Sequence, residues 1–506
     1  MHLQRVQVPD FRVLNDVDIT FERDFNPRVF PLGSQNGGGK STLLQLIFVL
    51  LHCSTNPERL PALKNLLNGF NLLEGQEQRL LSTINIWDGK KSVYLEFFIC
   101  GDSYINSILE SNNLDIPQQQ EENKLTFAIF SEKAKIEEQI SNLVRSQEEL
   151  EDLIQRFSDD NIILSANGNF SEFSNLLRRT RGNLQKFRIE APISMHLDRS
   201  LVPEIHRNIN LKLQKAYEDI KSKINDSTSQ LNDLNLQINE LVESLKSKDI
   251  EYITTYPSDE NNNENLALLC HMYNLDASDI NNPRQFLDDL SNKVFLAAPS
   301  TQIFLFLPRS IRKSLFKRDE IYNKNLGDVK SSLAGLFTYD FLAVNYLVDL
   351  FQQARDKDFK GAVETGEYGG NYKLLLNELN SLMISKRAYL KPDLDSSLHL
   401  SGVSFRENKS ADSIELYPED LSHGELKRLS IYCWLKYKNI EDSIVLMDEI
   451  DIALHPDWQY QIISDLREWA TNNQYILATH SYELCNALTP SHVKVLEPKL
   501  TERQSD

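Results

Sequence analysis

Two stretches of the chain carry apolar residues at alternating spacings of three and four. The first runs from Ile136 to Phe157 and is interrupted only by Gln147, and the second runs from Leu213 to Leu245 and is interrupted only by Ser227. A pattern sustained over this length, with polar flanks, predicts paired helices that form a coiled-coil arm. A long helix packed along the body of the protein is the alternative interpretation.

The remaining regions carry short apolar runs that favour strands and globular helices. Strands are expected at Leu3–Val8, Val17–Phe21, Arg28–Leu32, Ser92–Cys100, Lys124–Phe130, Val294–Ala297, Ile303–Leu307, Ile444–Met447 and Gln474–Ala478. Helices are expected to end near Cys53 and to cover Phe341–Gln353, with polar or glycine-rich loops at Asp259–Asn265 and Lys360–Asn371. We therefore predict an α/β body in two halves, residues 1–130 and 291–506, split by a helical insertion at 131–290.

The composition of the chain disfavours several classes of protein. The chain has 506 residues, of which 41% are hydrophobic and 25% charged, and its net charge of −19 means that any nucleic-acid contact must be a local basic patch. Its five cysteines lack C-x-x-C spacing, which disfavours disulfides and zinc and is typical of a reducing cytoplasm. The N-terminus shows no signal peptide, and the longest apolar run, Leu43–Leu51, is too short to span a bilayer.

A glycine-rich segment beginning at Gly33 follows one predicted strand and precedes an apolar helix. In a P-loop, successive backbone N–H groups at a helix N-terminus cradle phosphates, a lysine reaches the β- and γ-phosphates, and a hydroxyl binds Mg²⁺. Lys40 and Ser41 occupy those two positions, whereas Ser34 stands where the strict pattern has glycine. The residues expected to contact the nucleotide are Ser34, Gln35, Asn36, Gly37, Gly38, Gly39, Lys40, Ser41 and Thr42. Taken alone, the segment can also be a simple glycine-rich turn.

The apolar run Ile444–Met447 ends in Asp448 and Glu449, which lie far from the P-loop in the sequence. A buried strand would deliver both carboxylates to the edge of an α/β sheet where ligands bind. Asp448 is then expected to hold Mg²⁺, and Glu449 to act as the general base on the attacking water. Two solvated acids at the end of a strand are the alternative.

Two further segments can complete the site. Ser422 to Glu425 has the spacing of a capping box at the start of a helix, and the same helix N-terminus, with Gly424 beside it, can hold a γ-phosphate. His480 follows the strand Gln474–Ala478 and is expected to contact the γ-phosphate, although a lone histidine is more often structural.

Basic residues gather in two places. The first cluster comprises Arg178, Arg179, Arg181, Lys186 and Arg188, and the second comprises Arg309, Arg312, Lys313, Lys317 and Arg318. Solvated helix faces are the favoured interpretation of both clusters. The functional alternative is a DNA or RNA contact, chiefly through Arg178, Arg179, Arg181, Arg309 and Arg312.

Together these segments resemble the ABC-type ATPases of the SMC and RecF-like group. The resemblance is carried by Gln35–Leu44, Leu421–Glu425, Val445–Ile450, Leu454-His-Pro456 and Ala478–Ser481, and by the opening Phe11–Phe21. The Leu-His-Pro and Thr-His-Ser elements are similar to a branch found in bacterial anti-phage systems, which includes restriction-system-associated and Septu-type ATPases and the ATPase half of OLD nucleases.

The resemblance implies an ABC-type P-loop ATPase head with an inserted α-helical coiled-coil arm, using ATP and Mg²⁺. It implies a homodimer in which the P-loop, Asp448 and Glu449 of one head face Ser422 and Gly424 of the other, with Asp451 coupling the two sites. It also implies a Q-loop glutamine, for which Gln302 is a weak candidate. Residues 481–506 are too few for the nuclease domain of OLD proteins.

Three functions are then expected. The first is an ATP-gated sensor or clamp in a bacterial anti-phage system that controls a separate effector such as a nuclease. The second is a RecF-like repair or recombination clamp that binds DNA directly. The third is a scaffold that binds ATP without turnover, which Ser34 keeps open.

Overall fold

The computed structural model divides the chain into two compact units, one formed by Met1–Tyr104 with Leu245–Asp506 and the other by Ile105–Ser244. It describes residues 1–34, 37–111, 127–158, 170–190, 201–259, 262–274, 283–314, 320–339, 344–383, 388–394, 400–407, 415–417 and 420–496. Among these residues, no helix combines the length and the apolar character needed to cross a membrane.

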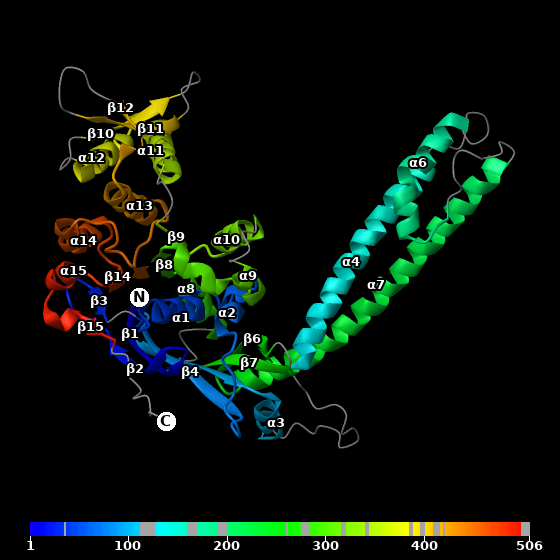
Figure 1. The fold of residues 1–506 in the computed structure, drawn as a ribbon, viewed down its shortest axis with the longest axis horizontal. Coiled ribbons are helices and arrows are strands. Elements are labelled where there is room, and N and C mark those ends of the chain that lie inside the picture. The colour runs from blue at the N-terminus through cyan, green and yellow to red at the C-terminus, as the bar shows by residue number, and fades with distance from the viewer. Residues whose placement is uncertain are drawn as a thin grey trace. The chain divides into compact units, whose positions relative to one another are not determined.

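The first unit, called the head below, contains a parallel sheet built from both ends of the chain (Figure 1). Its strand order is β15-β3-β14-β13-β8-β9. The strands are β3 (Val29–Gly33), β8 (Val294–Ala298), β9 (Leu336–Thr338), β13 (Ile444–Asp448), β14 (Gln474–Thr479) and β15 (Lys494–Val495). β13 and β14 are buried at every position, which explains their uninterrupted apolar sequences.

An antiparallel sheet of order β2-β1-β4-β5-β7-β6 lies in the same head. Its strands are β1 (His2–Phe11), β2 (Leu14–Thr20), β4 (Gln78–Trp87), β5 (Ser92–Cys100), β6 (Ile250–Asp259) and β7 (Asn262–Tyr273). Gln474 of β14 connects the two sheets, because its amide accepts a hydrogen bond from the Leu3 nitrogen at 2.6 Å and donates one to the Leu3 oxygen at 2.9 Å.

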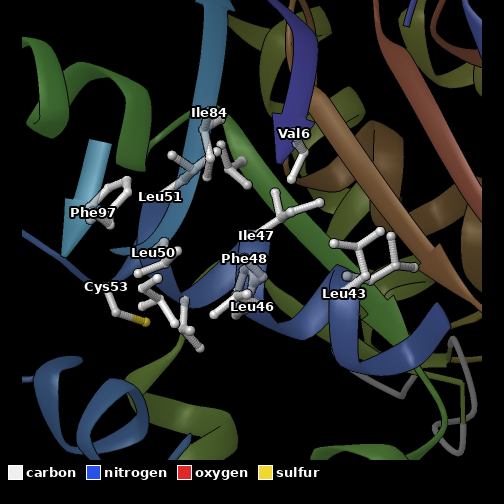
Figure 2. Packing of buried hydrophobic residues seen from close by; sticks show 14 of the residues in the cluster. Val6, Leu43, Leu46, Ile47, Phe48, Leu50, Leu51, Cys53, Ile84 and Phe97 are labelled. Carbon is white, nitrogen blue, oxygen red and sulfur yellow. The ribbon is translucent and has the colours of Figure 1, made fainter. Parts of the chain in front are cut away.

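Helix α1 (Lys40–His52) is buried along nearly its whole length. Figure 2 shows its apolar side chains, including Leu43, Ile47 and Leu51, packed with Val6 of β1, Ile84 of β4 and Phe97 of β5. Because both faces of this helix are covered, its sequence is hydrophobic all round.

A second core joins several of the other head helices to the parallel sheet. The other head helices are α2 (Leu60–Leu67), α8 (Pro283–Ser291), α9 (Arg309–Ser314), α10 (Glu320–Ser332), α11 (Val344–Thr365), α12 (Asn371–Met383), α13 (His423–Tyr437), α14 (Pro456–Trp469) and α15 (Tyr482–Asn486), with 3-10 turns η3 (Ser300–Phe306) and η7 (Pro490–His492). A small antiparallel sheet of β10 (Ala388–Leu394), β11 (Leu400–Glu407) and β12 (Glu415–Leu416) completes the head.

The second unit contains α4 (Ala128–Phe157), α6 (Phe170–Lys186) and α7 (Val202–Lys246), and α3 (Asp102–Ser111) crosses its first boundary. The apolar positions of the two heptad patterns in α4 and α7 are buried or half-buried. A shared core joins the three helices through residues such as Leu153, Leu177 and Leu213. Across α4 and α7, Gln147 Nε2 donates a hydrogen bond to the Tyr217 hydroxyl at 3.0 Å.

The structure places the unit boundaries elsewhere than at 130 and 290. Residues 250–273 return to the head, because β7 pairs with β5 from Tyr94 to Cys100 and β6 pairs with β7. The Asp259–Asn265 segment, expected as a loop, therefore contains the ends of two strands on either side of residues 260–261, which lie outside the described residues.

Three local predictions are wrong. Ile303–Phe306 belongs to the 3-10 turn η3 rather than to a strand. Of the strand expected at Lys124–Phe130, Ala128–Phe130 forms the first turn of α4, and residues 124–126 lie outside the described residues. The segment Lys360–Asn371 is not one flexible loop, because α11 continues to Thr365 and α12 starts at Asn371. The buried Asp358 carboxylate accepts hydrogen bonds from the Asn371 and Tyr372 nitrogens at 2.8 and 2.9 Å and so caps α12.

Candidate nucleotide site

The glycine-rich segment connects β3 to the N-terminus of α1. Gly37 and Gly39 adopt φ angles of 81° and 87°, which favour glycine. A Cβ on Gly39 would lie 2.6 Å from the Leu14 side chain of β2, so a larger residue there would force Leu14 to shift. Gln35 and Asn36 lie outside the described residues, whereas Gly38 and Thr42 occupy their expected places at the loop and in the first turn of α1.

Lys40 is buried at the first position of α1. Its Nζ donates hydrogen bonds to the backbone oxygen and the hydroxyl of Ser34, both at 3.1 Å. Burial lowers the pKa of Lys40, while the carboxylates of Asp448, Asp451 and Glu449 partly oppose that shift. Ser34, the departure from the strict glycine pattern, is therefore a direct partner of the P-loop lysine.

The two halves of the sequence meet at Ser41 and Asp448. The Ser41 hydroxyl donates a hydrogen bond to Oδ1 of Asp448 at 3.0 Å, although 407 positions separate the residues. The second carboxylate oxygen, Oδ2, is buried and has no hydrogen-bond partner. Burial raises the pKa of Asp448 to about 6, with Glu449 adding to the shift and the Ser41 hydrogen bond opposing it.

This pair fits a magnesium ion. Mg²⁺ prefers oxygen ligands, and an unpartnered buried carboxylate oxygen beside a hydroxyl is a suitable set when phosphates supply further oxygens. Among the described residues, no group of three or more histidine, cysteine, aspartate or glutamate side chains can hold a metal, so a site here depends on Ser41 and on phosphates.

Glu449 follows β13 and adopts a φ of 52°, which turns the chain sharply after Asp448. Its Oε1 accepts a hydrogen bond from Nε2 of Gln302 at 3.1 Å. Gln302 lies in η3, and its backbone oxygen accepts a hydrogen bond from Nε2 of the buried Gln45 in α1. The weakest candidate from the sequence thus contacts the expected general base directly.

Lys427 of α13 holds the segment that follows Glu449. Its buried Nζ donates hydrogen bonds to the backbone oxygens of Glu449 at 2.8 Å and Ile452 at 3.0 Å, and it lies 4.0 Å from the centre of the Tyr339 ring. A buried ammonium group is costly unless it is well solvated by such acceptors. This residue therefore fixes the backbone around Glu449.

Asp451 and His480 differ in their exposure to solvent. Asp451 is buried, and its Oδ1 accepts a hydrogen bond from the Thr479 hydroxyl at 2.7 Å. The Thr479 hydroxyl in turn accepts from the backbone nitrogen of Ser481 at 2.9 Å. His480, between these two residues, is exposed at the carboxyl end of β14.

Ser422 and Gly424 begin α13. Ser422 forms the expected capping box, in which the backbone nitrogen of Glu425 donates to its hydroxyl and its own nitrogen donates to the Glu425 carboxylate. Ser422 is exposed, whereas a Cβ on Gly424 would lie 2.7 Å from the Ala453 oxygen. Glycine at 424 thus also permits α13 to pack closely on the chain after Glu449.

The basic clusters fall in different units. Arg178, Arg179 and Arg181 are exposed on α6 of the second unit. Arg309 and Arg312 lie on α9 of the head and line a cavity together with Arg12 and Arg79. Lys317 and Arg318 lie outside the described residues.

Two residues at the site were not predicted from the sequence. Gln45 could have been found, since it is the one polar residue in the apolar run Leu43–Leu51. Lys427 gave no such signal, because its partners, the backbone oxygens of Glu449 and Ile452, belong to another segment of the chain.

Comparison with known proteins identifies the family. A family model described as "AAA domain, putative AbiEii toxin, Type IV TA system" matches residues 35–486. The chain is 43% identical over 55 residues to the Retron Ec83 probable ATPase of Escherichia coli, and 43% identical over 54 residues to the Retron Vc95 probable ATPase of Vibrio cholerae serotype O1 biovar El Tor. Each match spans 11% of this chain and 10% of the relative's length.

Solved structures with similarity to the chain include Smc heads. One is the Smc head domain with an extended coiled coil bound to the C-terminal domain of ScpA, derived from Pyrococcus furiosus, at 12% identity and a TM-score of 0.29, covering 96% of this chain and 91% of that one. Another is SmcHead bound to the C-winged helix domain of ScpA, at 9% identity and a TM-score of 0.31, covering 96% and 92%. These scores are too low to support a conclusion about function. The family match spans the P-loop, Asp448, Glu449 and His480, and on that basis the chain belongs to this AAA-domain family.

Proposed function

We propose that the head binds ATP with Mg²⁺ and hydrolyses it. The observation that carries the proposal is the Ser41–Asp448 hydrogen bond, which joins the P-loop to an acidic strand end and leaves a buried carboxylate oxygen available for a cation. Lys40 lies at the same N-terminus of α1, where helix dipole and backbone N–H groups favour phosphates.

Each side chain then has a defined role. Ser41 and Asp448 hold Mg²⁺, which supplies charge neutralisation at the phosphates when bound. Lys40 leaves Ser34 to bind the phosphates, and Glu449 takes a proton from the attacking water while Gln302 orients its carboxylate. His480 contributes a further contact to the γ-phosphate from the end of β14.

A second copy of the head is the proposed partner for this site. Apolar side chains are exposed beside Asp451 and His480, notably Ile452 at 53% and Tyr482 at 74%. Such exposure next to a nucleotide site favours burial against another protein surface. In the proposed homodimer, Ser422 and Gly424 of one head approach the nucleotide of the other, Asp451 couples the sites, and α4 with α7 forms the coiled-coil arm.

The proposed biological role is an ATP-gated sensor or clamp in a bacterial anti-phage system, controlling a separate effector such as a nuclease. Support comes from similarity to retron-associated probable ATPases and from the toxin-related description of the family. The restriction-associated and Septu-type branch remains the proposed subfamily.

The test compares wild-type protein with Glu449→Gln and Lys40→Ala. We expect wild type to hydrolyse ATP, Glu449→Gln to bind ATP without turnover and to sediment as a dimer, and Lys40→Ala to lose ATP binding. Turnover that is unchanged in Glu449→Gln contradicts the role of Glu449. ATP binding without turnover in the wild type, with no effect of Glu449→Gln, indicates the scaffold instead.

The partner is tested by affinity purification of tagged Glu449→Gln expressed with its native neighbouring genes. A stoichiometric effector with nuclease or other toxic chemistry supports the defence role. Recovery of nucleic acid without a protein partner contradicts it and favours the repair clamp, for which the exposed Arg178, Arg179 and Arg181 are the specific observation. The clamp requires binding that weakens steeply with salt.

A further inference from the structure

A second cavity in the head is rich in arginine and lies outside the set of nucleotide-site residues. It has a volume of about 570 Å³, and its lining includes Arg12, Asn68, Arg79, Phe304, Arg309 and Arg312. The β1–β2 turn, the chain after α2, β4, and η3 with α9 bring these residues together, and α2 packs against η3. Cavities of this volume are typical of small-ligand sites.

Three of the four guanidinium groups have no acidic partner in the part of the chain that the structure describes. Arg79 pairs with Asp10, but Arg12, Arg309 and Arg312 form no ion pair there. Arg12 instead donates a hydrogen bond to the Leu66 backbone oxygen at 2.6 Å. The cavity therefore concentrates positive charge on an otherwise acidic protein.

Burial and mutual repulsion of these guanidinium groups are energetically unfavourable. The pKa of Arg12 is lowered by its burial and, to a smaller extent, by the charge of Arg312. The pKa of Arg312 is likewise lowered by its burial and, to a smaller extent, by the charge of Arg309. The Nε of Arg312 is buried without a hydrogen-bond partner, which is unfavourable for a charged donor. An anion in the cavity would remove both the repulsion and the unsatisfied donor.

The arrangement suits a terminal phosphate better than a phosphodiester. A phosphomonoester carries about −1.5 to −2 charge at neutral pH, whereas each backbone phosphodiester carries one negative charge. In addition, a planar guanidinium group can donate two parallel hydrogen bonds to phosphate oxygens. The half-buried Phe304 and the Asn68 side chain give the cavity an apolar and a polar wall that can receive a base and sugar. The volume admits a nucleotide but not a duplex.

We propose that Arg12, Arg309 and Arg312 form a binding site for the terminal phosphate of a nucleotide, either a free mononucleotide or the phosphorylated end of a single strand. This site is separate from the P-loop residues and does not depend on ATP hydrolysis.

The test uses isothermal titration calorimetry on the full chain with hexathymidylate carrying a 5′-phosphate, a 3′-phosphate or no terminal phosphate. We expect a phosphorylated strand to bind wild type at least about tenfold more tightly than the unphosphorylated strand, given the strength of hydrogen bonds between charged groups. The preference should disappear in Arg309→Gln/Arg312→Gln and persist in Lys40→Ala. Arg145→Gln/Arg207→Gln removes the same charge from exposed positions of α4 and α7 and should leave the preference unchanged.

The melting temperature of each variant shows whether it is folded. Arg312→Lys is a second control, because it keeps the charge but loses the planar donor pair, and it should retain only part of the preference. Thymidine 5′-monophosphate as competitor separates the sources: displacement at equal concentration identifies a free nucleotide, and weak displacement identifies a strand end. A preference that survives the double arginine change, vanishes in Lys40→Ala, or is absent from wild type overturns the proposal. Failure of ATP hydrolysis affects none of these readouts.

Discussion

Nε2 of Gln302 lies 3.1 Å from Oε1 of Glu449 and donates a hydrogen bond to it. The contact joins η3 to the end of β13. The side-chain amide of Gln45 in α1 donates a hydrogen bond to the backbone oxygen of Gln302. The expected general base is therefore oriented by residues from two other segments of the head. This relationship gives Gln302 a role that can be separated from nucleotide binding.

Gln302→Ala should lower kcat for ATP hydrolysis by about tenfold to a hundredfold, because the Glu449 carboxylate loses the donor that orients it. Nucleotide affinity should change little, since Lys40, Ser41 and Asp448 remain. Steady-state hydrolysis together with fluorescent-nucleotide titration measures both quantities. Gln459→Ala, which removes an amide bonded to Asp451 and Leu454 oxygens, serves as the comparison, and an equal loss of kcat there would contradict a specific role for Gln302.

The elements around the candidate nucleotide site were predictable because their sequences satisfy local rules. β3, α1, β13 and β14 are rich in apolar residues, glycines lie between β3 and α1, and acidic residues lie at the end of β13. Each element was expected within a few residues of its observed bounds. The Ser422 capping box was likewise visible from its spacing.

Long-range pairing explains what the sequence did not show. β6 and β7 were missed because their place is set by β5, which lies before the helical insertion. Ile303–Phe306 has the composition of a strand, yet these residues form a 3-10 turn whose Gln302 must reach Glu449. In the sequence, Lys427 does not differ from any other helical lysine, and only the structure shows its acceptors, the Glu449 and Ile452 oxygens.

Lys427→Met should destabilise the head by about 2–3 kcal/mol, because the hydrogen bonds from a charged donor to two backbone oxygens are lost. ATP hydrolysis should fall further than stability alone explains, since the backbone of Glu449 is released. Chemical denaturation and hydrolysis assays measure the two effects. Lys438→Met changes an exposed lysine at the end of the same helix and should alter neither. A stable Lys427→Met protein with normal hydrolysis would refute the role.

Removal of magnesium should abolish most of the stabilisation that ATP gives to the wild type. Ligand binding stabilises the folded state by about 2.7 kcal/mol at a hundredfold excess over Kd, so a shift in melting temperature reports site occupancy. Asp448→Asn should lose the magnesium-dependent part of that shift, as should Ser41→Ala. Asp457→Asn, at the exposed start of α14, is the matched carboxylate control. A shift that is the same with EDTA and with Mg²⁺ would exclude a metal-assisted nucleotide site.

The head should lose stability as the pH falls below about 6.5, and His52 should account for part of the loss. This buried side chain connects α1 to two other segments, because one ring nitrogen lies 2.6 Å from the Ser291 oxygen and the other accepts a hydrogen bond from the Gly335 nitrogen at 3.2 Å. Burial lowers the pKa of His52 from 6.5 to about 4. The unfolded chain therefore binds a proton before the folded one does, so the neutral ring stabilises the fold above pH 6.5 and that contribution is lost as the pH falls toward 4, by about 3 kcal/mol in full.

His52→Gln should flatten the dependence of the unfolding free energy on pH between 7 and 5, even though the variant is less stable at pH 7. Urea denaturation at several pH values measures the slope for each protein. His423→Gln, at an exposed position of α13, should keep the wild-type slope. His2 is also buried, and its pKa is likewise lowered to about 4, so a residual slope should remain in His52→Gln and fall again in the variant that also carries His2→Gln. Equal slopes in wild type and His52→Gln would show that His52 is protonated alike in the folded and unfolded chains, and the neutral link between α1 and Ser291 would then be wrong.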